Sequence, residues 1–292
     1  MTAEAPLIVY KKPSQLKEVW RRMKKNRAAM IGLVIFSIIL FFALFADQIR
    51  PYNSALTQNI RNRLQTPSRE YPFGTDGYGR DLFARCLHGT RTSLSLGLIS
   101  TVVSLLLGLF FGSAAGYYGG KTDTIIMRMV DVVAAIPSIL MALAVVAALG
   151  ASRLNLILAV SFARIPAVLR VVRSSVMSQI DQEFVEAARA GGTGDFRIIR
   201  KSILPNAMGP ILVQATMSVA QNILSATILS FMGLGINPPT PELGAIISES
   251  REFMRTAYYL MLFPGFIIIL STLSLNLVGD GIRDALDPRL KN

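Results

Sequence analysis

The chain has 292 residues, of which 52% are hydrophobic and only 16% are charged, whereas a soluble domain carries about a quarter of charged residues, so the composition indicates a membrane protein. The formal net charge is +12, but the cations lie between long apolar runs rather than along a polar domain, which excludes nucleic acid and favours anionic lipids and charged protein partners. One cysteine and one histidine exclude both a disulfide framework and a Cys/His metal site within the chain.

Six apolar stretches are each long enough to cross the hydrocarbon core of a membrane, which takes about 20 residues in a helix. Their hydrophobicity is continuous rather than alternating, which favours helices over the short strands of a β-barrel. We therefore predict an all-α integral membrane protein with six transmembrane helices, at residues 28–46, 93–116, 125–150, 154–177, 208–233 and 258–278.

Basic residues before the first span predict the orientation, because positive side chains stay on the cytoplasmic side. They are Lys11, Lys12, Lys17, Arg21, Arg22, Lys24, Lys25 and Arg27. Residues 1–27 are thus a cytoplasmic tail, and six crossings also place the carboxyl terminus and the 181–206 loop in the cytoplasm. Residues 28–91 supply the first helix and an external loop, and residues 92–292 a five-helix core. The seven arginines of the external loop do not fit this preference for the cytoplasmic side. The predicted orientation is therefore based on the charges that flank the first span.

Small residues recur at every fourth position of the second span, at Ser104, Gly108, Gly112 and Gly116. Such a stripe lets two helix backbones approach closely. The partner is either a neighbouring helix of this chain or another subunit. Three aromatic residues near span ends are expected at the level of the lipid headgroups: Trp20, Tyr117 and Tyr118.

The sequence Gly120-Lys121-Thr122 matches the end of a phosphate-binding loop. The first glycine of that motif is replaced by Ala115, and the segment follows a transmembrane helix instead of a strand. Glycines that end one helix and open a turn into the next explain the segment without a nucleotide. We expect no cofactor on this chain, and any ATP and magnesium on a partner.

The polar segment 181–206 is too hydrophilic to cross the membrane, yet it keeps helical patterning. One predicted apolar stripe holds Phe184, Ala187, Ala188 and Gly191, and after a break at glycines a second holds Phe196, Ile199 and Ile203, before Pro205. These patterns predict two short helices at an angle on the cytoplasmic face. An interfacial helix that rests on headgroups is the alternative.

Within this segment, Glu186-Ala187-Ala188, then Gly192 after three residues and Leu204-Pro205 after eleven more, resemble the EAA loop of permease subunits of bacterial ATP-binding cassette importers. The family usually has isoleucine two positions before the leucine, where this chain has Ser202. Other stretches are similar to the C-type subunit of dipeptide and oligopeptide importers. They are Phe73-Gly-Thr-Asp-Gly-Tyr-Gly-Arg-Asp81, Met127-Arg-Met-Val-Asp131 with Pro137, Gly233-Leu-Gly235 with the prolines that follow, and Asn276-Leu-Val-Gly-Asp-Gly-Ile-Arg-Asp-Ala-Leu-Asp-Pro288.

This resemblance implies the permease core of a type I importer, located in a bacterial or archaeal inner membrane. Its implied partners are a second permease subunit, two cytoplasmic ATPases and an external peptide-binding protein, which docks on the outer loops. The chain itself is expected to be non-catalytic. The resemblance also implies which residues couple to an ATPase: Glu186, Ala187, Ala188, Arg189, Gly192 and Asp195.

Polar residues inside spans are costly and usually face a cavity or a partner. Arg128 and Asp131 are three residues apart, so we predict a structural ion pair between them. Arg164 near the middle of the fourth span either neutralises a peptide carboxylate in transit or pairs with a neighbour. The fifth span contributes three residues that line the path or bond between helices: Gln214, Gln221 and Asn222.

Three other functions are weighed against a peptide importer. Nickel or another small solute is carried by the same architecture. A secondary transporter needs inverted repeats or several membrane carboxylates, and only Asp131 is a clear membrane acid. A membrane enzyme needs paired acids, a histidine dyad or metal ligands in the spans, and the sequence offers none of these.

Overall fold

The computed structural model describes residues 15–286, and Lys11, Lys12, Asp287 and Pro288 lie outside the described residues. The described chain is helical, apart from turns and one isolated bridge between Thr75 and Asp81. In chain order its elements are α1 (Gln15–Met23), α2 (Arg27–Leu44), α3 (Ala46–Ile49), α4 (Tyr52–Leu56), the 3-10 helix η1 (Ile60–Asn62), α5 (Leu82–Tyr118), α6 (Gly120–Ala134), α7 (Ser138–Leu149), α8 (Arg153–Ile180), α9 (Glu183–Ala190), α10 (Asp195–Ile198), the π-helix η2 (Ile199–Ile203), α11 (Leu204–Phe231), α12 (Leu243–Glu249), the 3-10 helix η3 (Arg251–Phe253) and α13 (Tyr259–Leu286).

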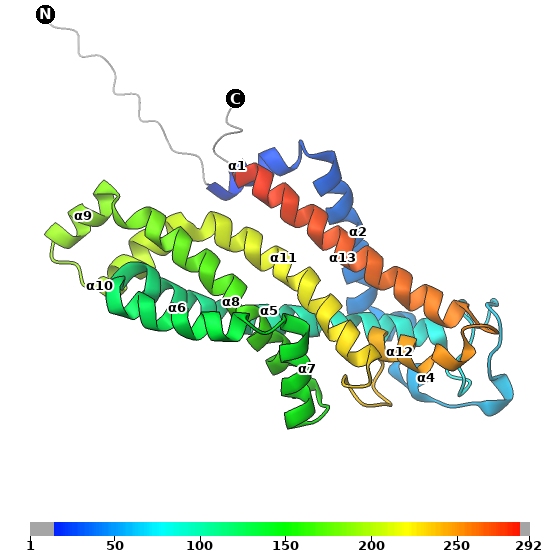
Figure 1. Ribbon diagram of the computed structural model, residues 1–292. Helices are drawn as coiled ribbons and strands as arrows, with labels where there is room; N and C mark the ends of the chain where they lie inside the picture. The colour runs from blue at the N-terminus through cyan, green and yellow to red at the C-terminus, as the bar shows by residue number, and fades with distance from the viewer. Residues whose placement is uncertain (1–14, 287–292) are drawn as a thin grey trace, which may run out of the picture.

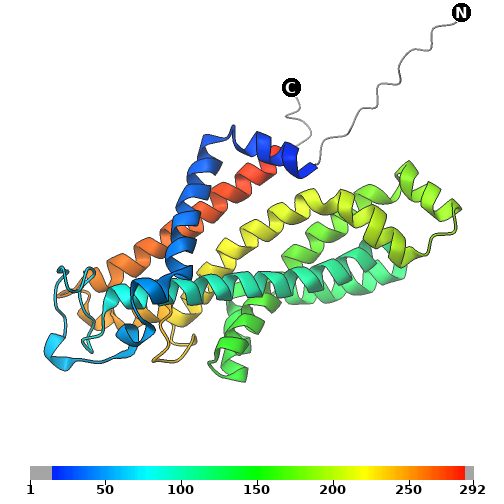
Figure 2. The same cartoon turned by 180° about the vertical axis from the view of Figure 1, so that it is seen from behind.

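The predicted all-helical membrane fold is confirmed. Among the described residues, five helices are long and apolar enough to cross a membrane, or six if the bent pair α6 and α7 forms one span. Figure 1 shows α9 and α10 at one end of the elongated bundle and α4 and α12 at the opposite end. Seen from behind, α5 runs along most of this length (Figure 2).

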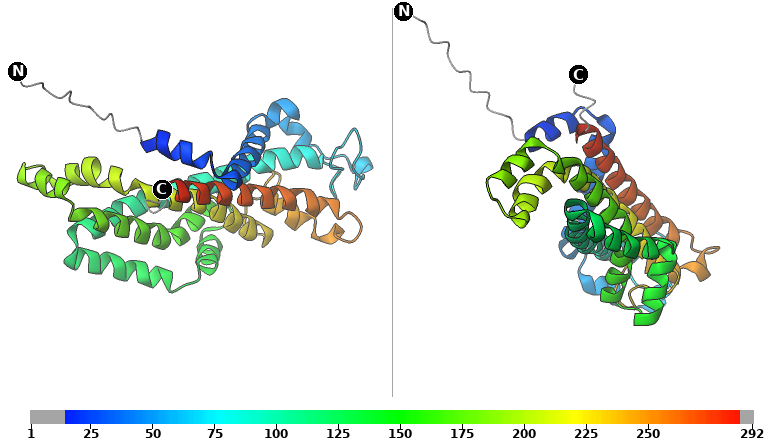
Figure 3. Two further views of the ribbon diagram at one scale, coloured as in Figure 1. Left: turned by 90° about the horizontal axis from the view of Figure 1, so that it is seen from above. Right: turned by 60° about the vertical axis from the view of Figure 1, so that its left-hand side comes forward.

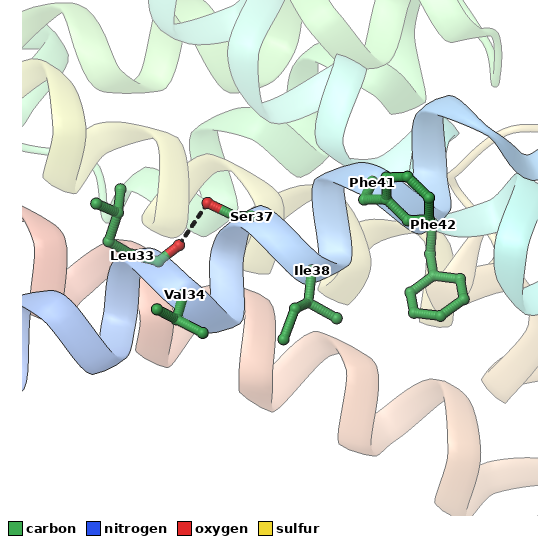
Figure 4. Close-up of a pocket in the computed structure, with 6 residues that line it drawn as sticks. All are labelled: Leu33, Val34, Ser37, Ile38, Phe41 and Phe42. Atoms are coloured by element: carbon green, nitrogen blue, oxygen red, sulfur yellow. Dashed lines mark hydrogen bonds between the residues drawn. The ribbon is translucent and has the colours of Figure 1, made fainter.

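Helix α2 starts at an N-cap, where the side chain of Asn26 accepts a hydrogen bond from the amide of Ala29. It packs along α13, and a Cβ atom at Gly32 would lie 2.9 Å from the carbonyl oxygen of Ser274. The other side of α2 is apolar. The hydroxyl of Ser37 on this side donates within the helix, to the carbonyl of Leu33 at 2.7 Å. Figure 4 shows this open apolar hollow, which is lined by Leu33, Val34, Ser37, Ile38, Phe41 and Phe42.

Helix α5 begins at Leu82, well before the predicted boundary at residue 93, so the first turns of the helix belong to what the sequence predicted as external loop. Asp81 caps this end: its Oδ1 accepts hydrogen bonds from the amides of Phe83 and Ala84. The cap satisfies amides that would otherwise lack partners at a helix start. Hydropathy did not place this boundary, because Arg85, His88 and Arg91 interrupt the apolar residues of these turns.

The third predicted span, residues 125–150, is not a single straight helix. It consists of α6 and α7, which meet at an angle of 83°. Pro137 stands at the break, where it precedes α7 and has extended backbone angles. Proline lacks an amide donor and disfavours a helical residue before it, which explains the break. Figure 3 shows α7 projecting from the side of the bundle.

The small-residue stripe of α5 packs against α8 of the same chain. A Cβ atom at Gly108 would lie 2.6 Å from the Val168 side chain, and one at Gly116 would lie 2.9 Å from the carbonyl oxygen of Arg173. Side chains larger than hydrogen would therefore separate the two backbones. The alternative in which a neighbouring helix of this chain is the partner is confirmed.

Candidate coupling and transport site

The segment between α8 and α11, here called the coupling segment (residues 181–206), starts with α9 and a glycine turn. The amide of Gly192 donates to the carbonyl of Arg189, 2.9 Å away, and the amide of Thr193 donates to that of Ala188, 3.0 Å away. This pair of bonds is a Schellman motif. Gly192 has φ +69°, which lies in the left-handed region that glycine enters without a steric cost. The turn predicted at Gly192 is present.

The second arm of the coupling segment is not a separate short helix. Helix α10 continues directly into η2, and η2 into α11. A π-helix is hydrogen-bonded between residues five apart, and the two buried residues of this arm, Ile198 and Ile203, have that spacing. Of the predicted stripe, Ile203 is buried and Ile199 is half-buried against the same apolar cluster. Phe196, its first residue, is 75% exposed.

Helix α9 is the first predicted short helix, and its buried residue is Val185, which is not part of the predicted stripe. Ala188 is half-buried. Phe184 is exposed, together with Glu186 and Ala187. The outward surface of the coupling segment therefore presents two aromatic rings and a carboxylate.

Arg189 and Asp195 meet at one aromatic ring. The hydroxyl of Tyr117, at the end of α5, donates to Oδ1 of Asp195 at 2.8 Å. The guanidinium carbon of Arg189 lies 5.2 Å from the centre of the same ring. Tyr117 was expected at the headgroup level, but it is buried and belongs to an apolar cluster with Val185. Tyr118, the next residue, is exposed.

Two of the four residues predicted along the substrate path are brought together. Nε of Arg164, in α8, donates to Oδ1 of Asn222, in α11, at 3.4 Å. The amide of Asn222 in turn donates to Oγ1 of Thr101, in α5, at 2.9 Å. These bonds connect three helices, so Asn222 bonds between helices, which is one of the two roles predicted for it. The remaining two lie apart from this group: Gln214 donates to Ser218 within its own helix, and Gln221 is exposed.

The predicted ion pair between Arg128 and Asp131 is not formed. Oδ1 of Asp131 instead accepts a hydrogen bond at 2.9 Å from Arg170 of α8. The spacing within α6 permitted the local pair, but the arginine on the neighbouring helix is the partner. A second bridge joins the same helices, in which both carboxylate oxygens of Asp123 accept hydrogen bonds from Arg173.

A buried ionic cluster occupies the opposite end of the molecule. Asp76, in the external loop, accepts hydrogen bonds at 2.6 Å from Arg80 and from Arg85. Both arginines also contact Glu249 at the end of α12, and the distance from Arg85 Nη1 to Glu249 Oε2 is 3.0 Å. Arg80 and Arg85 are 3% and 1% exposed. The cluster thereby joins the external loop, α5 and α12 through paired charges.

Burial also affects the carboxylate that caps α5. The pKa of Asp81 is raised above its ordinary value, because burial disfavours the charged form. Hydrogen bonds from the amides of Ala84 and Phe83 and the charge of Arg50 oppose this effect only in part. Across residues 15–286, no group of three His, Cys, Asp or Glu side chains is placed to hold a metal ion.

Residues 104–292 match the family described as the binding-protein-dependent transport system inner membrane component. The chain belongs to this family. Residues 14–67 match a second family, described as the N-terminal TM domain of oligopeptide transport permease C. The resemblance noted from the EAA loop is therefore confirmed, and this permease is a non-catalytic, multi-pass component of a bacterial inner membrane.

The permease is similar along nearly its whole length to curated relatives. It is 41% identical to the di/tripeptide transport system permease protein DppC of Pseudomonas aeruginosa, over 99% of this chain and 97% of the relative. It is 44% identical to the dipeptide transport system permease protein DppC of Alkalihalophilus pseudofirmus, over 97% and 93%. It is 41% identical to the glutathione transport system permease protein GsiD of Escherichia coli, over 96% and 94%.

Solved structures support the fold of the permease. An inward-facing conformation of the MetNI methionine ABC transporter aligns with a TM-score of 0.57 and 18% identity, over 70% of this chain and 98% of that chain. An amino acid ABC transporter with histidines aligns with a TM-score of 0.55 and 16% identity, over 69% and 94%. At these identities the likeness concerns the fold alone.

Sequence reasoning missed three residues that the structure places at these sites. Tyr117 was interpreted as an interfacial aromatic residue, because sequence spacing does not show that it lies next to the EAA loop. Arg170 was not considered as the partner of Asp131, because it lies on another helix. Glu249 was not considered, because it lies far along the chain from the Phe73–Asp81 stretch, which supplies an acid and an arginine to the same charge cluster.

Proposed function

We propose that this chain is one of the two permease subunits of an ATP-driven importer of di- or oligopeptides. Its relatives of known name carry dipeptides, tripeptides or glutathione, and each is matched over more than 90% of its length. The observation that carries the coupling role is the coupling segment itself. It projects at one end of the bundle and exposes Phe184, Glu186 and Phe196 to a partner (Figure 1).

In this proposal, two cytoplasmic ATPases bind ATP and magnesium, and one of them receives α9 in a surface groove. Ala187 and Ala188 permit a close approach, the two exposed phenylalanines fill apolar hollows of the groove, and Glu186 meets a complementary charge. ATPase closure then displaces the coupling segment, and the helices on either side of it tilt as rigid bodies. A second, homologous permease completes the path, and an external binding protein delivers the peptide.

We assign the polar group in the middle of the bundle to the substrate path. Arg164 is half-buried, and its hydrogen bond to Asn222 is long, at 3.4 Å. A peptide carboxylate that enters the path offers the guanidinium a charged acceptor in place of this neutral one, which strengthens the interaction. Gln214 and Gln221 are assigned to the same path because they are polar residues of the same helix as Asn222. Their side chains do not join the group.

The orientation follows from the same proposal: both termini and the coupling segment face the cytoplasm. Cys86, the single cysteine of the chain, is buried, so an introduced cysteine is the reactive one. Gly194→Cys in the coupling segment should react with a membrane-impermeant maleimide only in inside-out vesicles. Ser68→Cys in the external loop is the matched control and should react only in right-side-out vesicles. The reverse pattern would refute the orientation.

The function is tested by copurification and reconstitution in lipid vesicles. The chain should copurify with a second permease and two ATPases, and the vesicles should hydrolyse ATP faster when binding protein and a dipeptide are both added. ATP hydrolysis that is stimulated by a nickel complex but not by peptides would show that the substrate is a nickel complex instead of a peptide. Uptake by this chain without any ATPase would favour a secondary transporter and end the proposal.

Reversal of one charge tests the assigned surface of α9. Glu186→Arg should lower peptide uptake by about tenfold or more, because a like charge then faces the ATPase. Glu252→Arg is the control for ATPase binding, since it makes the same change at an exposed residue of η3, at the opposite end of the molecule. The amount of bound ATPase is measured for both variants, and peptide uptake for Glu186→Arg. Equal amounts of bound ATPase in the two variants would show that α9 is not the docking helix.

A further inference from the structure

Tyr117 contacts both arms of the coupling segment. Its hydroxyl bonds to Asp195, on the arm that leads into α11, and its ring lies under Arg189, on α9. The glycine turn separates these two residues along the chain, so the two arms converge on one side chain of α5. Tyr117 is only 9% exposed, although it is the penultimate residue of its helix.

The apolar contacts of α9 do not by themselves fix its orientation relative to α5. Within α9 only Val185 is buried and Ala188 half-buried, so apolar packing attaches this helix along less than one turn and leaves its direction poorly defined. A hydrogen bond to a carboxylate is directional, and a cation over an aromatic face adds a second constraint. Together the two contacts orient the coupling segment relative to the end of α5.

Tyr117 is itself firmly held. It follows Gly116, whose hydrogen atoms leave the α5 backbone in close contact with α8 near Arg173. Arg173 is in turn bound to Asp123 by two hydrogen bonds, which joins α6 to α8 beside the same helix end. The ring therefore belongs to a three-helix assembly and moves with it.

We propose that Tyr117 is a positioning residue for coupling, which attaches both arms of the EAA loop to α5 so that displacement of α9 moves α5 as well as α8 and α11. This inference rests on the proposed function of the coupling segment and names the residue through which a third helix is engaged. The hydroxyl fixes the second arm through Asp195, and the ring fixes the first arm through Arg189.

The test uses the complete importer reconstituted in vesicles and measures peptide taken up per ATP hydrolysed. Tyr117→Phe removes the hydroxyl but keeps the ring, and it should lower this ratio by about tenfold, the effect of one charge-assisted hydrogen bond. Asp195→Ala should do the same. Asp195→Asn retains an acceptor oxygen but forms only a neutral hydrogen bond, so its ratio should lie between those of the wild type and Asp195→Ala. Tyr118→Phe, at the exposed neighbour, is the control.

The double variant Tyr117→Phe with Asp195→Ala distinguishes coupling from general damage. It should be no worse than either single variant, because both remove the same bond. An unchanged ratio in Tyr117→Phe, or losses that multiply in the double variant, would overturn the inference. If the wild-type importer shows no peptide-stimulated hydrolysis, the proposed function fails instead, so the two failures are distinguishable.

Discussion

Gly192 has a backbone conformation that side-chain-bearing residues reach only with strain. Its φ of +69° closes the Schellman motif after α9, and the space around it is open, since no atom lies within 4 Å of a Cβ built there. The restriction is thus conformational rather than steric. Gly194, two residues later, has φ −67° and equally open surroundings, so it offers a matched comparison.

Gly192→Ala should destabilise the turn by about 1 kcal/mol, because alanine is penalised in the left-handed region. Gly194→Ala should have almost no effect, because its backbone angles suit any residue. Hydrogen exchange of the amides in residues 185–193 should be about fivefold faster in the first variant than in the second. Similar exchange in both variants would contradict the importance of the left-handed turn.

Helices α5 and α8 approach each other closely at their glycine contacts. A Cβ atom at Gly112 would lie 2.9 Å from both the carbonyl oxygen of Leu169 and Cβ of Val172. Neither atom belongs to a flexible side-chain end, so the helices must separate to admit a methyl group. Gly265 in α13 has no atom within 4 Å of the same position.

Gly112→Ala should therefore lower the free energy of unfolding by about 1–3 kcal/mol through overpacking. Gly265→Ala should be neutral or raise it by up to about 1 kcal/mol, because alanine is the better helix former. Thermal unfolding in detergent micelles compares the two variants under one condition. A fall in melting temperature of the same size for both would mean that close approach of α5 and α8 is not required.

Some elements could be predicted from sequence because hydropathy reports them directly. The spans near residues 28–46, 154–177 and 208–233 correspond to α2, α8 and α11. Proline at position 137 made a bend in the third span expected, but its size of 83° could not be predicted, because an apolar run has the same hydropathy whether it is straight or bent. The π-helix was not predicted, because composition does not reveal a change in the spacing of buried residues from four to five.

The candidate site was predictable only where its residues are neighbours in sequence. The EAA pattern located the coupling segment, and the turn at Gly192 agrees with its geometry. Tyr117 lies 78 residues from Asp195, and Arg85 lies 164 residues from Glu249. Such partners depend on how helices pack against each other, which a single sequence does not specify.

The ionic cluster joins the external loop to the helical bundle through buried charges. Removal of Asp76 leaves the buried cations Arg80 and Arg85 with one shared acid, so Asp76→Ala should destabilise the protein by about 3–5 kcal/mol. Asp47→Ala breaks the exposed pair with Arg91 and should cost less than about 1 kcal/mol. Thermal unfolding and proteolysis of the external loop measure the difference. Equal effects would show that the cluster is not a structural anchor.

Helix α5 has 37 residues and no proline, which corresponds to a rod about 55 Å long. Arg85 fastens one end to the external loop and α12, and Tyr117 fastens the other end to the EAA loop. The helix is uninterrupted between these two contacts. In the proposed importer, a displacement of the EAA loop on the cytoplasmic side would therefore be carried to the external loop by one helix.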